Sequence, residues 1–419
     1  MYFSIDFSYA NPAEVHRLVR KPSQRYGTQK RSRLEGNEQV RRRKSDQASP
    51  PVKPGSDPVL SCPIVIAFDE GLPSDYPSMG GKCSGLSQII AAGAPVPRGF
   101  AITTHAYCEM LRVEDLCGEI ATLIAQHEAG NIAAEARISS QIRDAFMRRP
   151  MPAAVAESIQ AQYRLMCRSE SNLPVAVRSS ATTEDTPNAS FAGQGDTYLW
   201  IVGEDSVIER VKACWASLYS ARALAYRVGH RGARDVMMAV GVQKMIDALS
   251  SGVTMTLDPA TGDRSKIVIE SSWGLGELVS SGEVTPDQFY IDKILLEPIK
   301  KVISCKRVEL VPDVAAGKTI HRDVEPERQD IPSIDEHQIK MIAKLAKHLE
   351  RHFGQPQEIE WAIDRNRIEN DGVVLLQCRP ETVWSRKRSL PTNPQSKNYA
   401  VGIEGIVSTL LTPVKIRKP

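Results

Sequence analysis

The sequence predicts a protein of the α+β class that is built in two lobes. Its length of 419 residues favours two or three domains, because a domain commonly spans about 100–200 residues. Residues 106–167 show the periodicity of helices, whereas residues 236–291 contain four short apolar segments that are typical of strands. The composition, 42% hydrophobic and 25% charged, is that of a globular chain and excludes collagen-like, coiled-coil and wholly disordered proteins.

Residues 1–58 differ from the rest of the chain in charge. They hold 12 Lys and Arg against 6 Asp and Glu, whereas the remaining residues hold 41 and 44. Because this segment also has little apolar periodicity, we expect a basic, disordered N-terminal arm. Nucleic-acid binding by residues 17–44 is the alternative to a solvated tail. Residues 385–419 are polar and basic around an apolar patch at 401–411, and we expect a C-terminal tail there.

The sequence has none of the features of a membrane or secreted protein. No stretch approaches the ~20 apolar residues that span a bilayer, and the N-terminus lacks the apolar core of a signal peptide. The eight cysteines include no C-x-x-C pair, so we expect reduced thiols and no zinc site. These features predict a cytoplasmic protein with no membrane partner.

We expect the first lobe at residues 59–240. It begins with an apolar strand at Ile64–Phe68, followed by a helix at Ser84–Ala92 that a glycine ends. A second strand at Phe100–Thr103 precedes a long helical region at 106–167. The lobe continues with a strand at Val175–Val177, a Gly- and Ser-rich loop at 181–196, a helix at 205–227 and a strand at Val236–Met245.

The second lobe, expected at residues 241–384, is richer in strands. Residues 335–353 carry Ile339, Ile342 and Leu349 on one face, which predicts an amphipathic helix. Three strands are predicted before this helix and two after it, at Gly252–Leu257, Lys266–Glu270, Gln288–Ile291, Ile359–Ile363 and Val373–Cys378.

A glycine-rich segment, Gly80-Gly81-Lys82, precedes the first predicted helix. Successive backbone N–H groups near a helix start can hold a phosphate, and an adjacent Lys adds a positive charge. The segment is not a P-loop, because Tyr76 stands where that motif needs Gly and Cys83 where it needs Ser or Thr. A common surface turn is the alternative interpretation.

A second candidate segment begins with Arg178 at the end of a predicted strand. Hydroxyl and small residues follow, and then Gly193 and Gly195. The planar guanidinium of Arg offers several donors to phosphate oxygens, and glycines allow close approach of the backbone. The alternative is a long surface loop with an Arg in an ion pair.

The third candidate lies on the last two predicted strands. Because residues i and i+2 of a strand share a face, Glu358 and Glu360 should project together, as should Gln377 and Arg379. Carboxylate and amide oxygens suit Mg²⁺, which prefers few protein ligands together with substrate phosphates. The alternative is an exposed strand face with ordinary pairing.

Taken together, these segments follow a specific order. It runs Gly-Gly-Lys at 80–82, Val-Arg-Ser-Ser-Ala-Thr-x-Glu-Asp at 177–185, Phe-Ala-Gly-Gln at 191–194, Val-Gln-Lys-Met at 242–245, Trp-Gly-Leu-Gly-Glu at 273–277, Ile-Glu-Trp at 359–361 and Gln-x-Arg-Pro at 377–380. This order resembles the N-terminal nucleotide-binding domain of the phosphoenolpyruvate synthase and pyruvate phosphate dikinase family. Rifampicin phosphotransferase and phenylphosphate synthase share that domain. The resemblance covers about residues 63–384.

The resemblance implies an ATP-grasp fold, in which two lobes clamp ATP between them. It assigns phosphate contacts and catalysis to Lys82, Arg178 and Arg379. It also implies a phosphate contact from the backbone N–H of Gly193 and, as a weaker correspondence, from Thr197. These roles agree with the donor chemistry of the residues, since phosphoryl transfer depends on positioning and charge stabilisation.

The same resemblance assigns the rest of the ATP site. Gln243 is expected on the adenine side, and Glu360 and Gln377 at the ribose or as ligands of Mg²⁺. The implied cofactors are ATP and Mg²⁺. The sequence departs from the family at Cys83, where Gly is usual, and a Cβ at this position can narrow the phosphate turn.

Complete members of the family also carry a swivelling domain with a phospho-accepting His and a domain for the second substrate. None of the eight His of this sequence stands in the motif of that His. We therefore expect the His, and the acceptor domain with it, on a separate partner subunit. The chain is then a phosphotransferase component that is inactive without this partner.

Three functions follow from this expectation. The leading one is the ATP-binding subunit of a split dikinase like phenylphosphate synthase, which converts ATP, a phenol and water into an aryl phosphate, AMP and phosphate. An alternative is the ATP-binding part of a split phosphoenolpyruvate synthase, a pyruvate, water dikinase. The last is a non-catalytic ATP-sensing module. The acceptor cannot be identified from the sequence, because split organisation alone favours the phenol.

Overall fold

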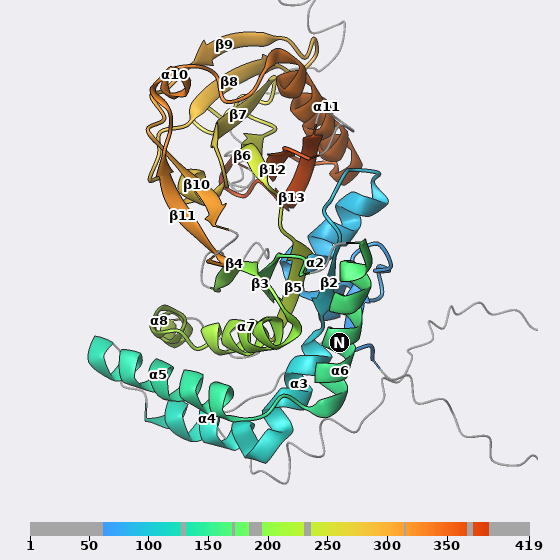
Figure 1. Cartoon of the computed structure of the whole chain (residues 1–419), viewed down its shortest axis with the longest axis vertical. Coiled ribbons are helices and arrows are strands. Elements are labelled where there is room, and N and C mark those ends of the chain that lie inside the picture. The colour runs from blue at the N-terminus through green and yellow to red at the C-terminus, as the bar shows by residue number, and fades with distance from the viewer. Residues whose placement is uncertain are drawn as a thin grey trace, which may run out of the picture.

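The computed structural model describes residues 62–126, 131–169, 172–183, 195–229, 236–313, 316–366 and 372–384. The predicted N-terminal arm at 1–58, the predicted tail at 385–419 and Gly193 lie outside the described residues. The described chain forms two antiparallel sheets with helices packed on them (Figure 1). The predicted α+β class is confirmed. None of the helices in the described part has the length and apolar character that crossing a bilayer requires.

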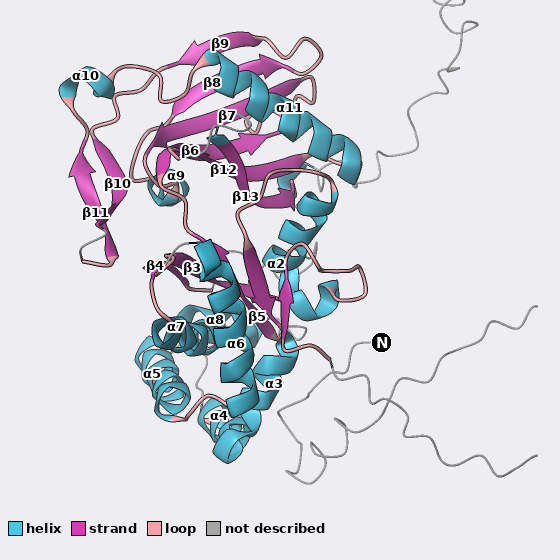
Figure 2. Cartoon of the chain, turned by 45° about the vertical axis from the view of Figure 1, so that its right-hand side comes forward, coloured by secondary structure: helices cyan, strands magenta, loops and turns pink. Residues whose placement is uncertain are grey.

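The first sheet has five strands, and most of the helices pack against it (Figure 2). In spatial order its strands are β1 (Val65–Ala67), β2 (Gly99–Ile102), β5 (Met238–Lys244), β3 (Val175–Ala181) and β4 (Thr197–Ile201). The helices of this lobe are α2 (Tyr76–Ala91), α3 (Thr104–Arg112), α4 (Leu116–Ala125), α5 (Ile132–Arg148), α6 (Ala153–Met166), α7 (Glu204–Ser217) and α8 (Ala221–Gly229), with short 3₁₀ turns at Val113–Asp115 and Cys167–Ser169.

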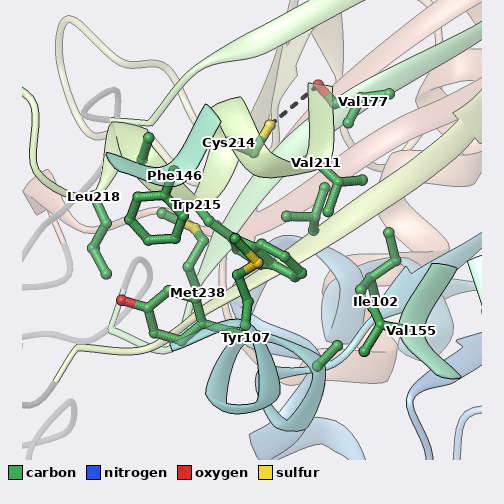
Figure 3. Close-up of a cluster of buried hydrophobic side chains, with 14 of the residues drawn as sticks. Ile102, Tyr107, Phe146, Val155, Val177, Val211, Cys214, Trp215, Leu218 and Met238 are labelled. Carbon is green, nitrogen blue, oxygen red and sulfur yellow. Dashed lines mark hydrogen bonds between the residues drawn. The ribbon is translucent and has the colours of Figure 1, made fainter. Parts of the chain in front are cut away.

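One face of this sheet and the helices beneath it share a large apolar core. Trp215 of α7 is fully buried there, beside Tyr107 of α3 and Phe146 of α5 (Figure 3). The thiol of Cys214 in the same helix points at the carbonyl oxygen of Val177 in β3, 3.8 Å away. Because aromatic side chains bury large apolar areas, this core fixes α7 under the strand that carries Arg178.

The second sheet has six strands and is covered on one face by α11. Its strands in spatial order are β13 (Val373–Pro380), β12 (Gln357–Asp364), β6 (Ala248–Met255), β7 (Lys266–Trp273), β8 (Asp287–Asp292) and β9 (Pro298–Val302). Helix α11 (Glu336–Phe353) starts with a capping box between Asp335 and Gln338 and ends at Gly354, which has φ 69°. Its apolar face packs on this sheet, as the sequence predicts. The smaller elements are α9 (Glu277–Ser281), α10 (Pro326–Gln329) and a hairpin of β10 (Val308–Asp313) and β11 (Lys318–Asp323).

The chain passes from the first sheet to the second between Lys244 and Ala248. The predicted lobe boundary at residue 240 falls inside β5, because this strand pairs with β3 along its whole length and with β2 over residues 240–243. The segment that contains Pro95 and Arg98 runs beside the crossing. The carbonyl oxygen of Arg98 accepts a hydrogen bond from Lys244 N at 2.8 Å, and that of Pro95 accepts one from Leu375 N of β13, also at 2.8 Å. Two adjacent segments therefore connect the lobes.

Helix α2 starts at Tyr76, eight residues before the predicted start. Glycine disfavours helix, so the pair at positions 80 and 81 conceals this first turn in the sequence. Gly80 has φ 71° and ψ 173°, which kinks the helix. Helix α2 lies on the face of the first sheet opposite the aromatic core and also contacts β13.

Strand β4 and the hairpin of β10 and β11 are not predicted from the sequence. Strand β4 has a register shift against β3, and its Trp200 has φ 58°. Such a backbone is strained for a bulky residue. Trp200 is nevertheless buried, in an apolar cluster with Leu275 and Leu310 of the second lobe. Strand β11 contacts β4, so the hairpin bridges the two lobes beside β4 (Figure 1).

Candidate functional site

A cavity of about 290 Å³ lies between the two sheets. Residues of the first sheet and of the second sheet line it, together with the crossing at Met245 and Ile246. Its size is near the lower end of pockets that hold small ligands, which are about 300–1,000 Å³. The apolar part of its wall consists of Ala176, Leu199, Met245, Ile246, Ala248, Leu275, Trp361, Ala362 and Leu376.

Arg178 is the centre of the polar part of the wall. It lies on β3, and its side chain is only 16% exposed. Its guanidinium donates hydrogen bonds to the carbonyl oxygen of Leu376 at 3.0 Å, to Gln377 Oε1 at 2.8 Å and to Glu360 Oε2 at 3.3 Å. These three acceptors lie on β12 and β13 of the other sheet. A weaker contact of 3.4 Å joins it to Gln243 Oε1 on β5.

The pairing of β12 with β13 explains why these acceptors converge. Glu360 is directly opposite Gln377, and Glu358 is directly opposite Arg379, with which it forms an ion pair. Side chains opposite each other in an antiparallel pair project to one face. The shared face that the i, i+2 spacing predicts is therefore confirmed, and Arg178 contacts it from the other lobe.

The glycine-rich turn of α2 packs against β3 beside Arg178. An ideal Cβ on Gly80 would lie 2.0 Å from the carbonyl oxygen of Ser180, so only glycine fits this close approach. The hydroxyl of Ser180 donates to the carbonyl oxygen of Met79 at 3.0 Å and accepts from Cys83 N at 3.1 Å. Lys82 Nζ donates to the carbonyl oxygen of Ser179 at 3.2 Å. Lys82 of α2 is thus bonded to Ser179, the residue that follows Arg178 on β3.

The position of Cys83 explains how the chain accommodates this departure from the family. Cys83 is buried, and its sulfur lies 2.9 Å from where a Cβ on Gly241 would stand. The side chain therefore occupies the space between α2 and β5 that Gly241 leaves open. It belongs to the apolar core there, with Phe68 and Met79, and does not line the cavity.

Gln243 supplies a donor that the described residues do not use. Its side chain is buried, and its Nε2 atom has no hydrogen-bond partner within the described part of the chain. An unpaired buried donor costs free energy, commonly about 1–3 kcal/mol. A ring nitrogen of a bound base would satisfy this donor, so the site fits a nucleotide base next to its apolar wall.

Most of the residues that the sequence predicts for the site lie together. Arg178, Thr197, Gln243 and Glu360 line the cavity, and Gln377 contacts Arg178. Lys82 and Arg379 are not among the lining residues, but each lies close to them. Lys82 bonds to the residue after Arg178, and Arg379 is two residues along β13 from Gln377.

The turn after β7 also lines the cavity, although no role was predicted for it. Gly276, Glu277 and Ser280 contribute to the wall. Gly274 has φ 72°, and a Cβ there would lie 2.4 Å from the carbonyl oxygen of Leu310. The signal for this turn is present in the sequence, because two glycines spaced by one residue follow a buried strand.

The metal-binding potential of the site is limited to oxygen ligands. Among the described residues, no group of three or more His, Cys, Asp or Glu side chains could hold a metal ion. Glu360 and Gln377 lie side by side and bond to the same guanidinium. Two such oxygens fit Mg²⁺ where phosphate oxygens and water complete its coordination.

Comparison with known proteins identifies the domain. The family model for the AMP/ATP-binding domain of pyruvate phosphate dikinase matches residues 76–399. The chain belongs to this family. Its membership confirms the predicted ATP-grasp fold, and the family domain is described as one that binds AMP or ATP.

Several relatives of this dikinase family are named phosphoenolpyruvate synthase. The protein of Aeropyrum pernix is 40% identical over 356 residues, which cover 78% of this chain and 43% of that protein. The probable phosphoenolpyruvate synthase of Staphylothermus marinus is 38% identical over 78% of this chain and 42% of its own length. The synthase of Escherichia coli K12 is 35% identical, with 78% and 43% covered. The chain thus spans less than half the length of these relatives.

Proposed function

We propose that the chain is the ATP-binding part of a dikinase of the phosphoenolpyruvate synthase type. Such an enzyme cleaves ATP to AMP and phosphate and passes a phosphoryl group through a His to pyruvate. The names of the relatives favour pyruvate over the phenol that split organisation led us to expect. The observation that carries the proposal is Arg178, whose guanidinium bonds to Glu360 of β12 and to Gln377 of β13 in the other lobe.

The cavity offers separate places for the parts of ATP. We assign adenine to the apolar wall at Met245, Ile246 and Leu275, where Gln243 Nε2 can donate to a ring nitrogen. The phosphates then lie toward Arg178 and the kinked first turn of α2. This arrangement places the uncharged base on apolar surface and the anionic groups near cations, as differential solvation requires.

The contacts of Arg178 support an exchange of partners when ATP binds. In the described structure its donors are occupied by Glu360 and Gln377. We propose that phosphate oxygens replace these two acceptors, because Arg binds phosphate in a bidentate manner. The oxygens of Glu360 and Gln377 would hold Mg²⁺, which would neutralise phosphate charge when bound. Lys82 of α2, which bonds to the carbonyl oxygen of Ser179, adds a second cation beside this strand.

The phosphoryl acceptor in this proposal is a His that the described residues do not supply. We propose that a partner subunit carries it, together with the domain that binds pyruvate. Because the His divides one transfer into two steps, the chain alone should bind ATP without turning it over.

A product assay tests the proposal. Purified protein is incubated with ATP and Mg²⁺, with and without a His-bearing partner, and with pyruvate or phenol as acceptor. AMP and phosphate that appear only with the partner and pyruvate are expected. Dependence on phenol instead would return the chain to the phenylphosphate synthase type. ATP binding without AMP in every combination would contradict a catalytic role and favour the ATP-sensing module.

The matched control is an arginine of the same lobe. Arg164 pairs with Glu204 on the surface, with Nε and Oε1 2.7 Å apart. Arg178→Ala should abolish AMP formation, whereas Arg164→Ala should leave it unchanged. Equal effects of the two substitutions would show that the cavity is not where ATP reacts.

A further inference from the structure

One residue of β3, Ser179, connects the two predicted phosphate-binding cations to a residue outside the cavity. The carbonyl oxygen of Ser179 accepts the hydrogen bond from Lys82 Nζ, at 3.2 Å. The N–H group of the same residue donates to the carbonyl oxygen of Asp196, at 3.1 Å. Ser179 follows Arg178 directly, and Arg178 is opposite Thr197 in the pairing of β3 with β4. A shift of Asp196 would therefore move this part of β3.

The carboxylate of Asp196 is bound to the helical side of the lobe. Arg143 of α5 donates to Asp196 Oδ2 at 3.0 Å, and the hydroxyl of Tyr198 donates to the same oxygen at 2.7 Å. Arg210 of α7 lies over the ring of Tyr198, 5.1 Å from its centre. Burial, and then the neighbouring Asp196 carboxylate, raises the pKa of Tyr198 to about 12. The hydroxyl consequently stays a donor to this carboxylate at any physiological pH.

The backbone N–H of Asp196 also forms a hydrogen bond, to Ser217 of α7. Asp196 N donates to Ser217 Oγ at 3.2 Å, and that hydroxyl donates to the carbonyl oxygen of Cys214 at 2.7 Å. A Cβ on the preceding Gly195 would lie 2.0 Å from Ser179 Oγ, so the chain here passes directly against β3. Asp196 thus joins β3, α5 and α7, and Figure 1 shows both helices under β3 and β4.

We propose that Asp196 is a positioning residue for the phosphate end of the ATP site. It acts through Ser179, whose backbone N–H and carbonyl groups set the place of Lys82 and of the neighbouring Arg178. The inference rests on the proposed function, because it assumes that these two cations bind the phosphates of ATP. An exposed ion pair contributes little to stability, so the contact with Arg143 matters here through the geometry that it fixes.

The number of phosphates on the ligand separates positioning from general stability. ATP carries the β- and γ-phosphates that need both cations, and AMP does not. Displacing a binding group by about 1 Å can cost roughly 100-fold in function, and a smaller displacement is expected here. We expect Asp196→Ala to raise the dissociation constant of ATP by about tenfold and that of AMP by less than about threefold.

The experiment is isothermal titration calorimetry with ATP and with AMP, both with Mg²⁺, on the full chain. Asp196→Asn keeps an oxygen acceptor for Arg143 and Tyr198, so it should restore most of the affinity for ATP. Tyr198→Phe removes one of the two donors and should fall between the wild type and Asp196→Ala. Glu204→Gln is the matched control, because Glu204 accepts from Arg164 on the same lobe, and it should change neither constant.

The outcomes distinguish the two proposals. An equal loss of ATP and AMP affinity in Asp196→Ala, or no loss of either, would overturn the positioning role while ATP binding by the wild type stands. A wild type that binds neither nucleotide would instead refute the ATP site itself. If Asp196→Ala does not fold, as judged by circular dichroism, Tyr198→Phe decides, and an ATP-to-AMP ratio of dissociation constants identical to that of the wild type in Tyr198→Phe overturns the inference.

Discussion

Replacing Arg178 should weaken both the contact between the two lobes and the binding of ATP. The side chain donates three hydrogen bonds of 2.8–3.3 Å to the second sheet. A hydrogen bond with a charged partner contributes about 1.5–3 kcal/mol. Because Glu360 is partly exposed and can regain water, the three contributions do not add. We expect Arg178→Ala to lower the free energy of unfolding by about 2–4 kcal/mol.

The loss of free energy of ATP binding should be similar in size to the loss of free energy of unfolding. Losing an electrostatic donor to a phosphate costs about 2.7 kcal/mol of binding free energy. This loss raises the dissociation constant of ATP roughly 100-fold. In the wild type, ATP at 100 times its dissociation constant stabilises the fold by about 2.7 kcal/mol. At the same ATP concentration the variant should gain only about 0.4 kcal/mol, because the ligand is then near its dissociation constant.

Urea unfolding with and without ATP and Mg²⁺ measures both effects. Arg178→Lys retains the charge but lacks the planar fork of donors, and it should lie between the wild type and Arg178→Ala. Arg164→Ala is the control for the loss of a surface cation and should keep the full gain from ATP. If Arg178→Ala unfolds at the same urea concentration as the wild type and gains as much from ATP, the assignment of Arg178 is wrong.

Three further predictions concern other parts of the molecule. Gly80→Ala should cost more than the ~1–2 kcal/mol of a left-handed backbone, because its Cβ also meets Ser180; urea unfolding should show a larger loss than Gly93→Ala, whose Cβ meets nothing. Lys306→Met leaves the fully buried Asp287 without its ion-pair partner. This substitution should lower the free energy of unfolding by about 3–5 kcal/mol and therefore lower the melting temperature. An unchanged melting temperature would mean that the ion pair contributes nothing to stability. The pKa of Tyr198 is raised to about 12 from 10.0. The contribution of this hydroxyl to stability is therefore complete below pH 10 and is lost as the pH rises through 12. An ultraviolet titration of Tyr198→Phe should lack the tyrosinate step near pH 12, and an unchanged curve would contradict this.

Much of the polar site was predictable from local rules. The i, i+2 spacing on two strands places Glu360 and Gln377 on shared faces, and the glycines at 80 and 81 point to a phosphate turn. The sequence order of the segments then identifies the family. Which acceptors Arg178 contacts was not predictable, because they lie almost 200 residues away and their place depends on how two sheets pack.

The parts that escaped prediction share a physical cause. Strand β9 is exposed along nearly its whole length, so it lacks the alternation of apolar and polar residues that marks a half-buried strand. The strained backbone at Trp200 depends on packing against Leu275 and Leu310 of the other lobe. Helix α2 carries two glycines at positions 80 and 81, and Gly80 packs directly against β3. Strand β9 forms by pairing with β8, so in each case contacts with another segment of the chain, and not local preference, decide the structure.

The paired connection between the lobes limits how the molecule can deform. A single covalent tether would let one half swivel freely about its own axis. Here the tether at Lys244 is bonded to the backbone of Arg98, and Pro95 is bonded to β13 in turn. Two neighbouring tethers suppress torsion and leave mainly a bend about the line that joins them. Such a bend separates the edges farthest from that line, so we expect solvent to reach the cavity first where β4 meets β11.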